Sequence, residues 1–187
     1  MAKTTNLSNL IVRDAVEADM VATQRIYAHY VRRGLATFEE VPPSPVEMEA
    51  RRVAVALDGF PWLTAEADGE ILGYAYAGPY HKRTAYRHTV EDSIYVSAEA
   101  RGRGAGRALL NALIGRCEAG PWRQMVAVIG DSENFASIAL HRRLGFRPIG
   151  VLPAVGFKLG RWIDVVLMQR ALGAGSSSPP DPSTPPP

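Results

Sequence analysis

One stretch decides the fold of this chain: Arg101-Gly102-Arg103-Gly104-Ala105-Gly106-Arg107. It lies between an apolar run, Ile94-Tyr95-Val96, and a helical pattern over residues 108–117. A strand therefore leads into a glycine-rich turn, and the turn opens a helix. The glycines let the backbone approach a ligand closely, and the N–H groups at a helix N-terminus favour negative charge. Since the arginines add positive charge, the stretch suits a pyrophosphate.

Two common phosphate-binding motifs do not match this stretch. A Walker loop needs G-x-x-x-x-G-K-[ST], which the sequence lacks. The dinucleotide motif G-x-G-x-x-G would place its third glycine at Arg107. The alternative without a ligand is an ordinary strand-to-helix turn whose arginines are solvated.

Length and composition indicate one globular domain. The chain has 187 residues, of which 47% are hydrophobic and 21% charged, and its net charge of +2 does not favour nucleic acid as a partner. We expect neither a membrane span nor a signal peptide. The single cysteine, Cys117, cannot form an internal disulfide, which favours the cytoplasm.

The order of elements predicts the fold class. We expect one domain over residues 8–172 and a disordered Ser/Pro-rich tail over residues 173–187. Strands are expected at residues 10–12, 62–67, 71–77, 89–96 and 125–129, from residue 146 onward, and at 165–169. Helices are expected from Asp14 or Asp19 to Gly34, from the capping box at residues 44–47 to about residue 57, and over 108–117 and 134–143. This order predicts an α/β (α+β) fold with a mixed, mostly antiparallel sheet flanked by helices.

A second motif follows the loop: Asn134-x-x-Ser137-x-x-Leu140-His141-x-x-x-Gly145-Phe146. Together with Arg101-x-x-Gly104-x-Gly106, it resembles the signature of the GNAT N-acetyltransferase superfamily. The resemblance implies the GNAT acyl-CoA N-acyltransferase fold, in which two central strands splay apart, here residues 89–96 and 125–129. It also implies that acetyl-CoA is the co-substrate and that it is held by Ile94, Tyr95, Val96, Arg101, Gly102, Arg103, Gly104, Ala105, Gly106, Arg107, Asn134 and Ser137.

Further stretches narrow the resemblance to one branch of the superfamily. Residues 37–40, 89–97, 124–132 and 156–164 occur in the order and spacing of the phosphinothricin N-acetyltransferases, a branch that includes the methionine sulfoximine acetyltransferases. The similarity runs from about residue 11 to residue 172. It implies a homodimer, because that branch commonly pairs subunits near the active site.

Two residues are candidates for the chemistry. Glu91 matches the position of the family's general base, and a carboxylate on a mostly apolar strand should be partly desolvated, which raises its pKa. His141 stands where the family usually has Tyr, near the thioester sulfur, and a protonated His can donate to a leaving thiolate. The alternatives are a solvated or salt-bridged Glu91 and a His141 that only packs in its helix.

The basic, aromatic segment over residues 81–88 supplies groups that an anionic amine substrate needs. Arg83 and Tyr86 match the family's substrate positions, and Phe38 matches its aromatic wall; the alternative is a solvated basic loop. His81 and His88 have no third ligand at a useful spacing, so we expect no metal site.

The leading interpretation is an enzyme that transfers an acetyl group directly from acetyl-CoA to the amine of a small amino acid-like substrate. Direct transfer is expected because Cys117 falls on the apolar face of a helix and is a poor candidate for a nucleophile. The alternatives are a GNAT enzyme for another amine, such as a polyamine or a protein N-terminus, and a non-catalytic acyl-CoA-binding regulator.

Overall fold

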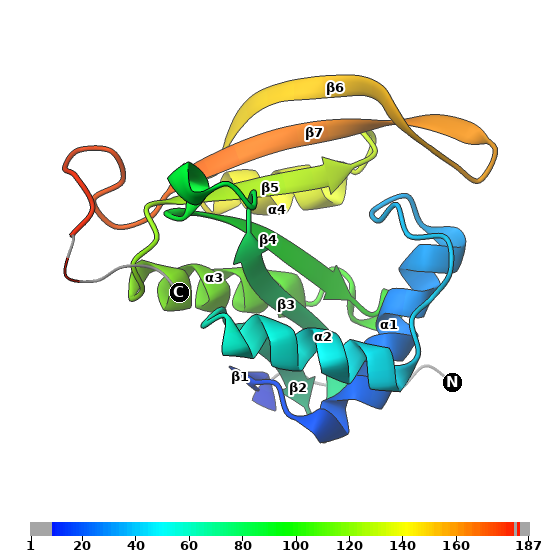
Figure 1. Cartoon of the computed structure of the whole chain (residues 1–187). Helices are drawn as coiled ribbons and strands as arrows, with labels where there is room; N and C mark the ends of the chain where they lie inside the picture. Colours follow the sequence, from blue (N-terminus) through cyan, green and yellow to red (C-terminus); the bar gives the residue numbers. More distant parts are fainter. Residues whose placement is uncertain (1–8, 182, 184–187) are drawn as a thin grey trace.

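The structure, a computed structural model, describes residues 9–181 and 183. A seven-stranded sheet runs through it in the order β1-β2-β3-β4-β5-β7-β6 (Figure 1). The strands are β1 (Ile11–Asp14), β2 (Trp62–Ala67), β3 (Glu70–Pro79), β4 (Thr89–Val96), β5 (Gln124–Gly130), β6 (Arg147–Lys158) and β7 (Arg161–Ala171). Neighbouring strands are antiparallel except β4 and β5, which are parallel. The mixed, mostly antiparallel sheet expected from the sequence is confirmed.

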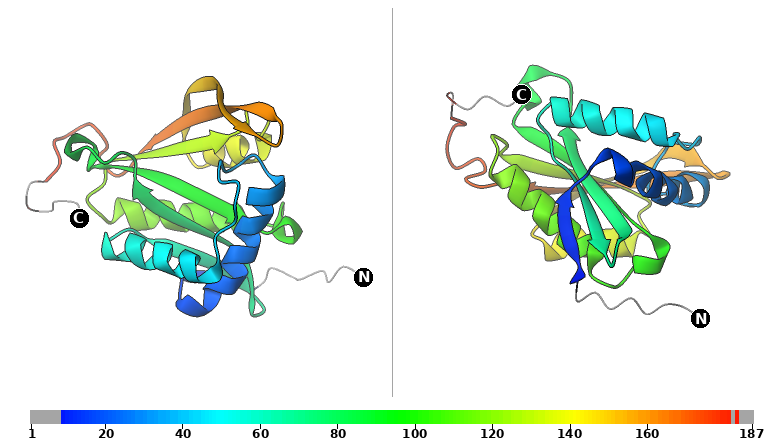
Figure 2. Two further views of the ribbon diagram at one scale, coloured as in Figure 1. Left: turned by 45° about the vertical axis from the view of Figure 1, so that its right-hand side comes forward. Right: turned by 90° about the horizontal axis from the view of Figure 1, so that it is seen from below.

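Helices cover both faces of this sheet (Figure 2). Helices α1 (Met20–Arg33) and α2 (Pro45–Leu57) lie on one face, and α3 (Ala105–Glu118) and α4 (Phe135–Arg143) lie on the other. Because side chains alternate along a strand, each face has its own core. Tyr74 and Tyr95 pack toward α1 and α2, whereas Ala75 and Met125 belong to the core beneath α3.

The helix starts follow the local sequence. At α2, the Glu47 N–H donates to Ser44 Oγ at 3.2 Å and the Ser44 N–H donates to Glu47 Oε2 at 2.6 Å, which is the expected capping box. Helix α1 begins directly after Asp19, one of the two expected starts. The Asp19 carboxylate accepts from the Arg13 guanidinium at 2.7 and 2.8 Å and does not cap α1.

Helix α3 and strand β7 exceed their expected bounds the most. Helix α3 begins at Ala105, three residues before the expected pattern, because Gly104 takes a left-handed conformation with φ of 94° and turns the chain into the helix. Strand β7 exceeds the expected residues 165–169 because it pairs with β6 along a long hairpin. The turn of this hairpin has positive φ at Leu159 (51°) and Gly160 (77°). Such turns usually carry Asn-Gly or Asp-Gly, so the Leu-Gly pair here does not indicate a hairpin.

The tail expected to be disordered falls partly on residues 182 and 184–187, which lie outside the described residues, as does residue 8. Within the described part, the chain turns after β7: the Gly175 N–H donates to the Leu172 carbonyl at 2.9 Å, and Arg123 donates to the Pro179 carbonyl at 3.1 Å. No helix among residues 9–181 is long and apolar enough to cross a membrane.

Candidate active site

The parallel strands β4 and β5 pair only over their first residues. Their register runs from Thr89 opposite Gln124 to Asp92 opposite Ala127. Beyond that point residues 93–96 of β4 are paired with β3 alone, so the edge that faces β5 can offer its backbone N–H and C=O groups to a ligand. This is the splay that the resemblance to the GNAT superfamily implies.

A cleft of about 830 Å³ lies at the splay. Of the residues expected to hold acetyl-CoA, those that line it are Ile94, Tyr95, Val96, Arg101, Gly102, Gly104, Gly106, Arg107, Asn134 and Ser137. Arg103 and Ala105 do not line the cleft, and the Ala105 side chain is fully buried at the start of α3. The two sequence motifs therefore meet across one cleft.

The backbone around the glycine loop is shaped for close approach. Gly102 and Gly104 have φ of 72° and 94°, a region that side chains strain. A Cβ at Gly106 would lie 3.4 Å from the Leu140 side chain and 3.5 Å from the Val96 side chain, which is ordinary contact distance. Because glycine has no Cβ, that space at the wall of the cleft is open to a ligand.

Charge and dipoles in the cleft also suit an anionic ligand. Helix α3 begins at the glycine loop. Helix α4 begins after Asn134, whose side-chain oxygen accepts a hydrogen bond from the Ser137 N–H at 3.3 Å. Arg101 and Arg107 line the same cleft. Helix N-termini and arginines are groups that bind a pyrophosphate, so the chain fits the diphosphate and pantetheine parts of coenzyme A.

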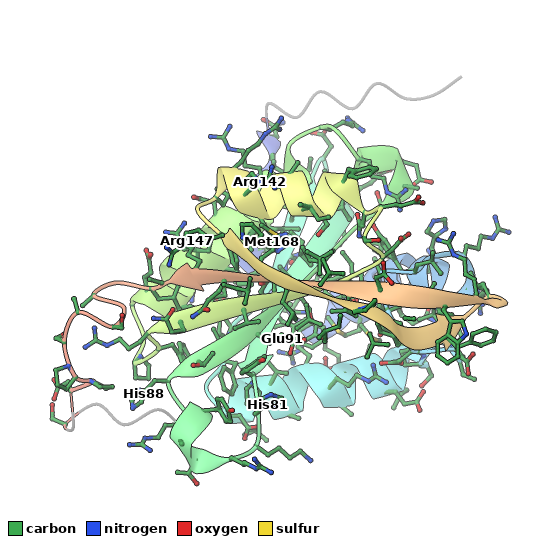
Figure 3. The ribbon with its side chains drawn as sticks, turned by 90° about the horizontal axis from the view of Figure 1, so that it is seen from above. His81, His88, Glu91, Arg142, Arg147 and Met168 are labelled. Carbon is green, nitrogen blue, oxygen red and sulfur yellow. The ribbon has the colours of Figure 1, made fainter. Side chains whose placement is uncertain are left out.

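Glu91 lies on the opposite face of β4 from α4 (Figure 3). Its side chain is half-buried and does not line the cleft. Burial raises the pKa of Glu91 to about 7, and the neighbouring charge of Asp92 adds to that rise. A carboxyl group that titrates near neutral pH can accept a proton from an ammonium group, as a general base requires.

His141 lines the cleft from α4, but its ring is buried and bonded on both sides. Its Nε2 lies 3.0 Å from Asp92 Oδ2, and its Nδ1 lies 2.8 Å from the Ser137 carbonyl oxygen. Burial alone would lower the pKa of His141, but the hydrogen bond and charge of Asp92 outweigh it, so the pKa is raised. The sequence analysis did not foresee this pair, although a two-residue strand period places Asp92 on the face toward α4.

The residues expected to bind the amine substrate lie outside the 830 Å³ cleft. The Phe38 ring covers Gly156 of β6, where a Cβ would stand 2.0 Å from it. The buried Lys158 ammonium donates to the Thr37 carbonyl at 2.7 Å and so holds the loop that carries Phe38. Tyr86 is exposed and packs edge-on against His81, with ring centroids 5.0 Å apart, and Arg83 precedes it in the same exposed segment.

Helix α1 contributes cleft residues that the sequence did not indicate: His29, Tyr30 and Arg33. The Tyr30 hydroxyl donates to the Val96 carbonyl at 2.7 Å, and the Arg101 guanidinium lies 5.4 Å from the centre of its ring. Tyr30 therefore fixes the end of β4. A tyrosine on an amphipathic helix resembles any core residue, so its sequence carries no signal of this role.

Cys117 is buried in α3, and burial raises the pKa of its thiol to about 12. Such a thiol is not a nucleophile at neutral pH. Among residues 9–181 and 183, no group of three or more His, Cys, Asp or Glu side chains is placed to hold a metal ion.

A sheet opened between two parallel strands, with a glycine loop and two helix N-termini at the opening, defines an acyl-CoA-dependent transferase. A family model described as "Acetyltransferase (GNAT) family" matches residues 23–146. The chain belongs to the GNAT family, and it is an N-acetyltransferase.

Relatives support this assignment. The chain is 56% identical over 170 residues to "Phosphinothricin N-acetyltransferase" of Alcaligenes faecalis, covering 91% of this chain and 86% of that protein. It is 44% identical over 169 residues to "L-methionine sulfoximine/L-methionine sulfone acetyltransferase" of Pseudomonas paraeruginosa (strain DSM 24068 / PA7), covering 90% and 98%. A phosphinothricin acetyltransferase from Sinorhizobium meliloti, solved in complex with acetyl-CoA, superposes with a TM-score of 0.90 at 49% identity, covering 94% and 95% of the two chains.

Proposed function

We propose that this enzyme acetylates the amino group of a small anionic amino acid of the phosphinothricin or methionine sulfoximine type. The observation that carries the proposal is Glu91, a carboxyl group with a pKa of about 7 one residue before the last β4–β5 pair. The names of the relatives support the substrate class. The single buried thiol is consistent with action in the cytoplasm.

The two faces of β4 divide the reaction between them. On the face toward α1 and α2, Glu91 accepts a proton from the substrate ammonium, and the freed nitrogen attacks the thioester carbonyl carbon across the splay. The carbon–sulfur bond then breaks, and the nitrogen gives up its second proton as the amide forms. The thiolate leaves on the side of α4, beside His141, and takes up one proton to become the free thiol of coenzyme A. The acetyl group passes directly to nitrogen, because the Cys117 thiol is buried and protonated.

Recognition of the substrate rests on the exposed segment before β4 and on the loop after α1. We assign Arg83 to an oxyanion of the substrate, because a guanidinium binds such groups through two parallel hydrogen bonds. Tyr86 and Phe38, which are 40% and 42% exposed, provide aromatic surface for the aliphatic part.

A substrate panel tests the proposal. Phosphinothricin, methionine sulfoximine and methionine sulfone are each supplied with acetyl-CoA, and release of the coenzyme A thiol is followed. We expect saturable turnover with these three and little with spermidine or with a peptide amine. Turnover confined to spermidine or the peptide would assign the enzyme to another amine, and coenzyme binding without any turnover would indicate a regulator.

We further propose that two copies of the chain form a homodimer through the outer edge of the sheet. Strand β6 is an edge strand, and apolar side chains project from the β6–β7 hairpin with more than half of their surface exposed: Ile149, Val151, Val155, Phe157, Leu159 and Trp162. An exposed edge with such a surface favours pairing with another copy. Light scattering at micromolar concentration should give twice the chain mass of 20.3 kDa, and Phe157→Asp should halve it. A wild-type monomer would contradict this proposal.

A further inference from the structure

A buried ion pair lies beside the splay, on the face of β4 opposite Glu91. The side chains of His141 and Asp92 are only 2% and 1% exposed, and Nε2 and Oδ2 are 3.0 Å apart. The other ring nitrogen lies 2.8 Å from the Ser137 carbonyl oxygen and 3.4 Å from the Ser137 hydroxyl, so the carbonyl is its nearer partner. A carboxylate and a carbonyl both accept hydrogen bonds, so satisfying both requires a proton on each ring nitrogen. With Asp92 ionised, this geometry fits an imidazolium.

Asp92 is the carboxylate that balances this charge. The residues paired with it across the sheet are Ala77 on β3 and Ala127 on β5, which carry no charge. From α3 the titratable group near it is the Cys117 thiol, whose raised pKa includes the charge of Asp92 as its second cause. The edge of the Phe146 ring packs on His141, with centroids 4.9 Å apart.

The second carboxylate oxygen, Asp92 Oδ1, is buried without a hydrogen-bond partner in the described part of the chain. An unpartnered buried oxygen is costly, and it belongs to a residue that lines the cleft. The charge of Asp92 also acts on the other face of the sheet, because Glu91 is its direct neighbour in β4.

We propose that Asp92 is a positioning residue for the proposed acetyl transfer: its carboxylate holds His141 as a fixed imidazolium at the wall of the cleft and places a negative charge behind Glu91. This inference rests on the proposed function and names a residue that acts on both catalytic groups. Asp92 raises the pKa of His141, and it contributes to the raised pKa of Glu91 after burial. On the face of β4 that carries Glu91, the charge of Glu91 is one cause of the raised pKa of the Tyr76 hydroxyl on β3, after burial.

The first test follows the ring of His141 directly and needs no substrate. Imidazole ¹⁵N spectra of the full chain are recorded from pH 5 to 9, and His141 is assigned by elimination with Gln variants of His29, His81 and His88. We expect His141 to be doubly protonated at pH 7.5 in the wild type and neutral at that pH in Asp92→Asn. A neutral ring in the wild type at pH 6, or an unchanged titration in the variant, would overturn the proposal.

The second test is the pH profile of kcat/KM. Asp92→Asn keeps the shape of the side chain but removes its charge. The acid limb, which reports Glu91, and the basic limb, which reports His141, should therefore both move to lower pH. Activity at pH 8 should be roughly tenfold lower. The control is Asp14→Asn, which removes an equal charge from an exposed pair with Arg116 and should leave both limbs in place. An equal loss at every pH, with unmoved limbs, would show a purely structural role.

The two tests separate this inference from the proposed function. If the wild type acetylates none of the panel amines, the proposed function fails, while the ¹⁵N titration still decides whether Asp92 holds His141 charged. If Asp92→Asn does not fold, Asp92→Ser replaces it, and the wild-type titration decides by itself. His141→Phe is not used, because it would leave Asp92 charged and unpaired in the core.

Discussion

Two adjacent carboxylates on β4 have opposite environments. Asp92 faces α4 and is paired with a buried His141, whereas Glu91 faces α1 and α2 and makes no hydrogen bond or ion pair within the described residues. The strand period of two residues places them on different sides of one sheet. Pairing holds the Asp92 carboxyl group against the His141 ring, while the lack of a partner leaves Glu91 free to gain and lose a proton near pH 7.

In the proposed reaction, the same division separates donor and acceptor sites. The glycine loop and the 830 Å³ cleft belong to the donor side, and the exposed segment with Arg83 and Tyr86 precedes Glu91 on the acceptor side. If this division is correct, single substitutions should affect one side and spare the other.

The largest effect is expected from removing the base. Glu91→Gln keeps the size of the side chain but cannot take a proton, so kcat should fall by about 10²–10⁴. Acetyl-CoA affinity, measured by calorimetry, should be unchanged, because Glu91 lies outside the cleft. Raising the pH should partly restore the rate, since more of the substrate amine is then already deprotonated.

The matched control for this variant is Glu70→Gln, which changes an exposed carboxylate at the start of β3. It should retain wild-type kinetics. A near wild-type kcat in Glu91→Gln at neutral pH would show that Glu91 is not the general base.

The glycine loop tests the donor side. Gly104→Val forces a branched side chain onto φ of 94° and narrows the approach to the backbone, so acetyl-CoA affinity should fall about 10- to 100-fold. Gly69→Val is the control, because Gly69 also has a positive φ of 79° with open space around it but lies in the β2–β3 turn. If both variants lost equal stability and neither lost affinity, the loop would not bind the coenzyme.

Arg83 tests the acceptor side. Arg83→Ala removes a charge-assisted partner for a substrate oxyanion, so KM for phosphinothricin should rise by roughly tenfold or more, with KM for acetyl-CoA little changed. Lys82→Ala removes a neighbouring positive charge from the same exposed segment and should have a smaller effect. Equal increases in both KM values for Arg83→Ala would assign the residue to folding instead.

Much of the fold could be predicted, because its signals are local. The capping box at Ser44, the turn at residues 68–69 and the glycine loop each specify a backbone conformation through their own residues. The β6–β7 hairpin was underpredicted, since its turn uses Leu159 in a left-handed conformation and its outer strand exposes apolar residues that usually indicate a core.

The site was predicted in part for a similar reason. Motif residues such as Gly104 and Asn134 could be assigned to the cleft because their positions follow from local signals, a turn glycine and a helix start. Tyr30 and Asp92 could not be assigned, because their roles depend on contacts with Val96 and His141, which lie 66 and 49 positions away. Such long-range pairs leave no pattern in a single sequence.

The smallest effect expected is on stability, and it follows from the unpaired state of Glu91. Burial raises the pKa of Glu91 from 4.5 to about 7, so the folded state binds this proton more tightly than the unfolded chain does. The stabilising contribution of the protonated form is therefore complete below pH 4.5 and is lost as the pH rises to 7. Glutamine has no such proton to lose. Glu91→Gln should be more stable than the wild type at pH 8 by roughly 1–2 kcal/mol, after allowance for the partial exposure of this group.

Urea unfolding at pH 4.5 and pH 8 measures this difference. His141 also has a raised pKa, and its contribution likewise falls as the pH rises through the folded-state value, but it is present in both proteins and cancels in the comparison. The gap between the two proteins should therefore open only above pH 4.5. A variant that is both slower and more stable at pH 8 would show that the acceptor side retains an ionisable carboxyl group at a cost in stability, because the reaction needs it. Equal stability at pH 8 would mean that Glu91 is solvated in the folded state, and the contrast with Asp92 would then rest on pairing alone.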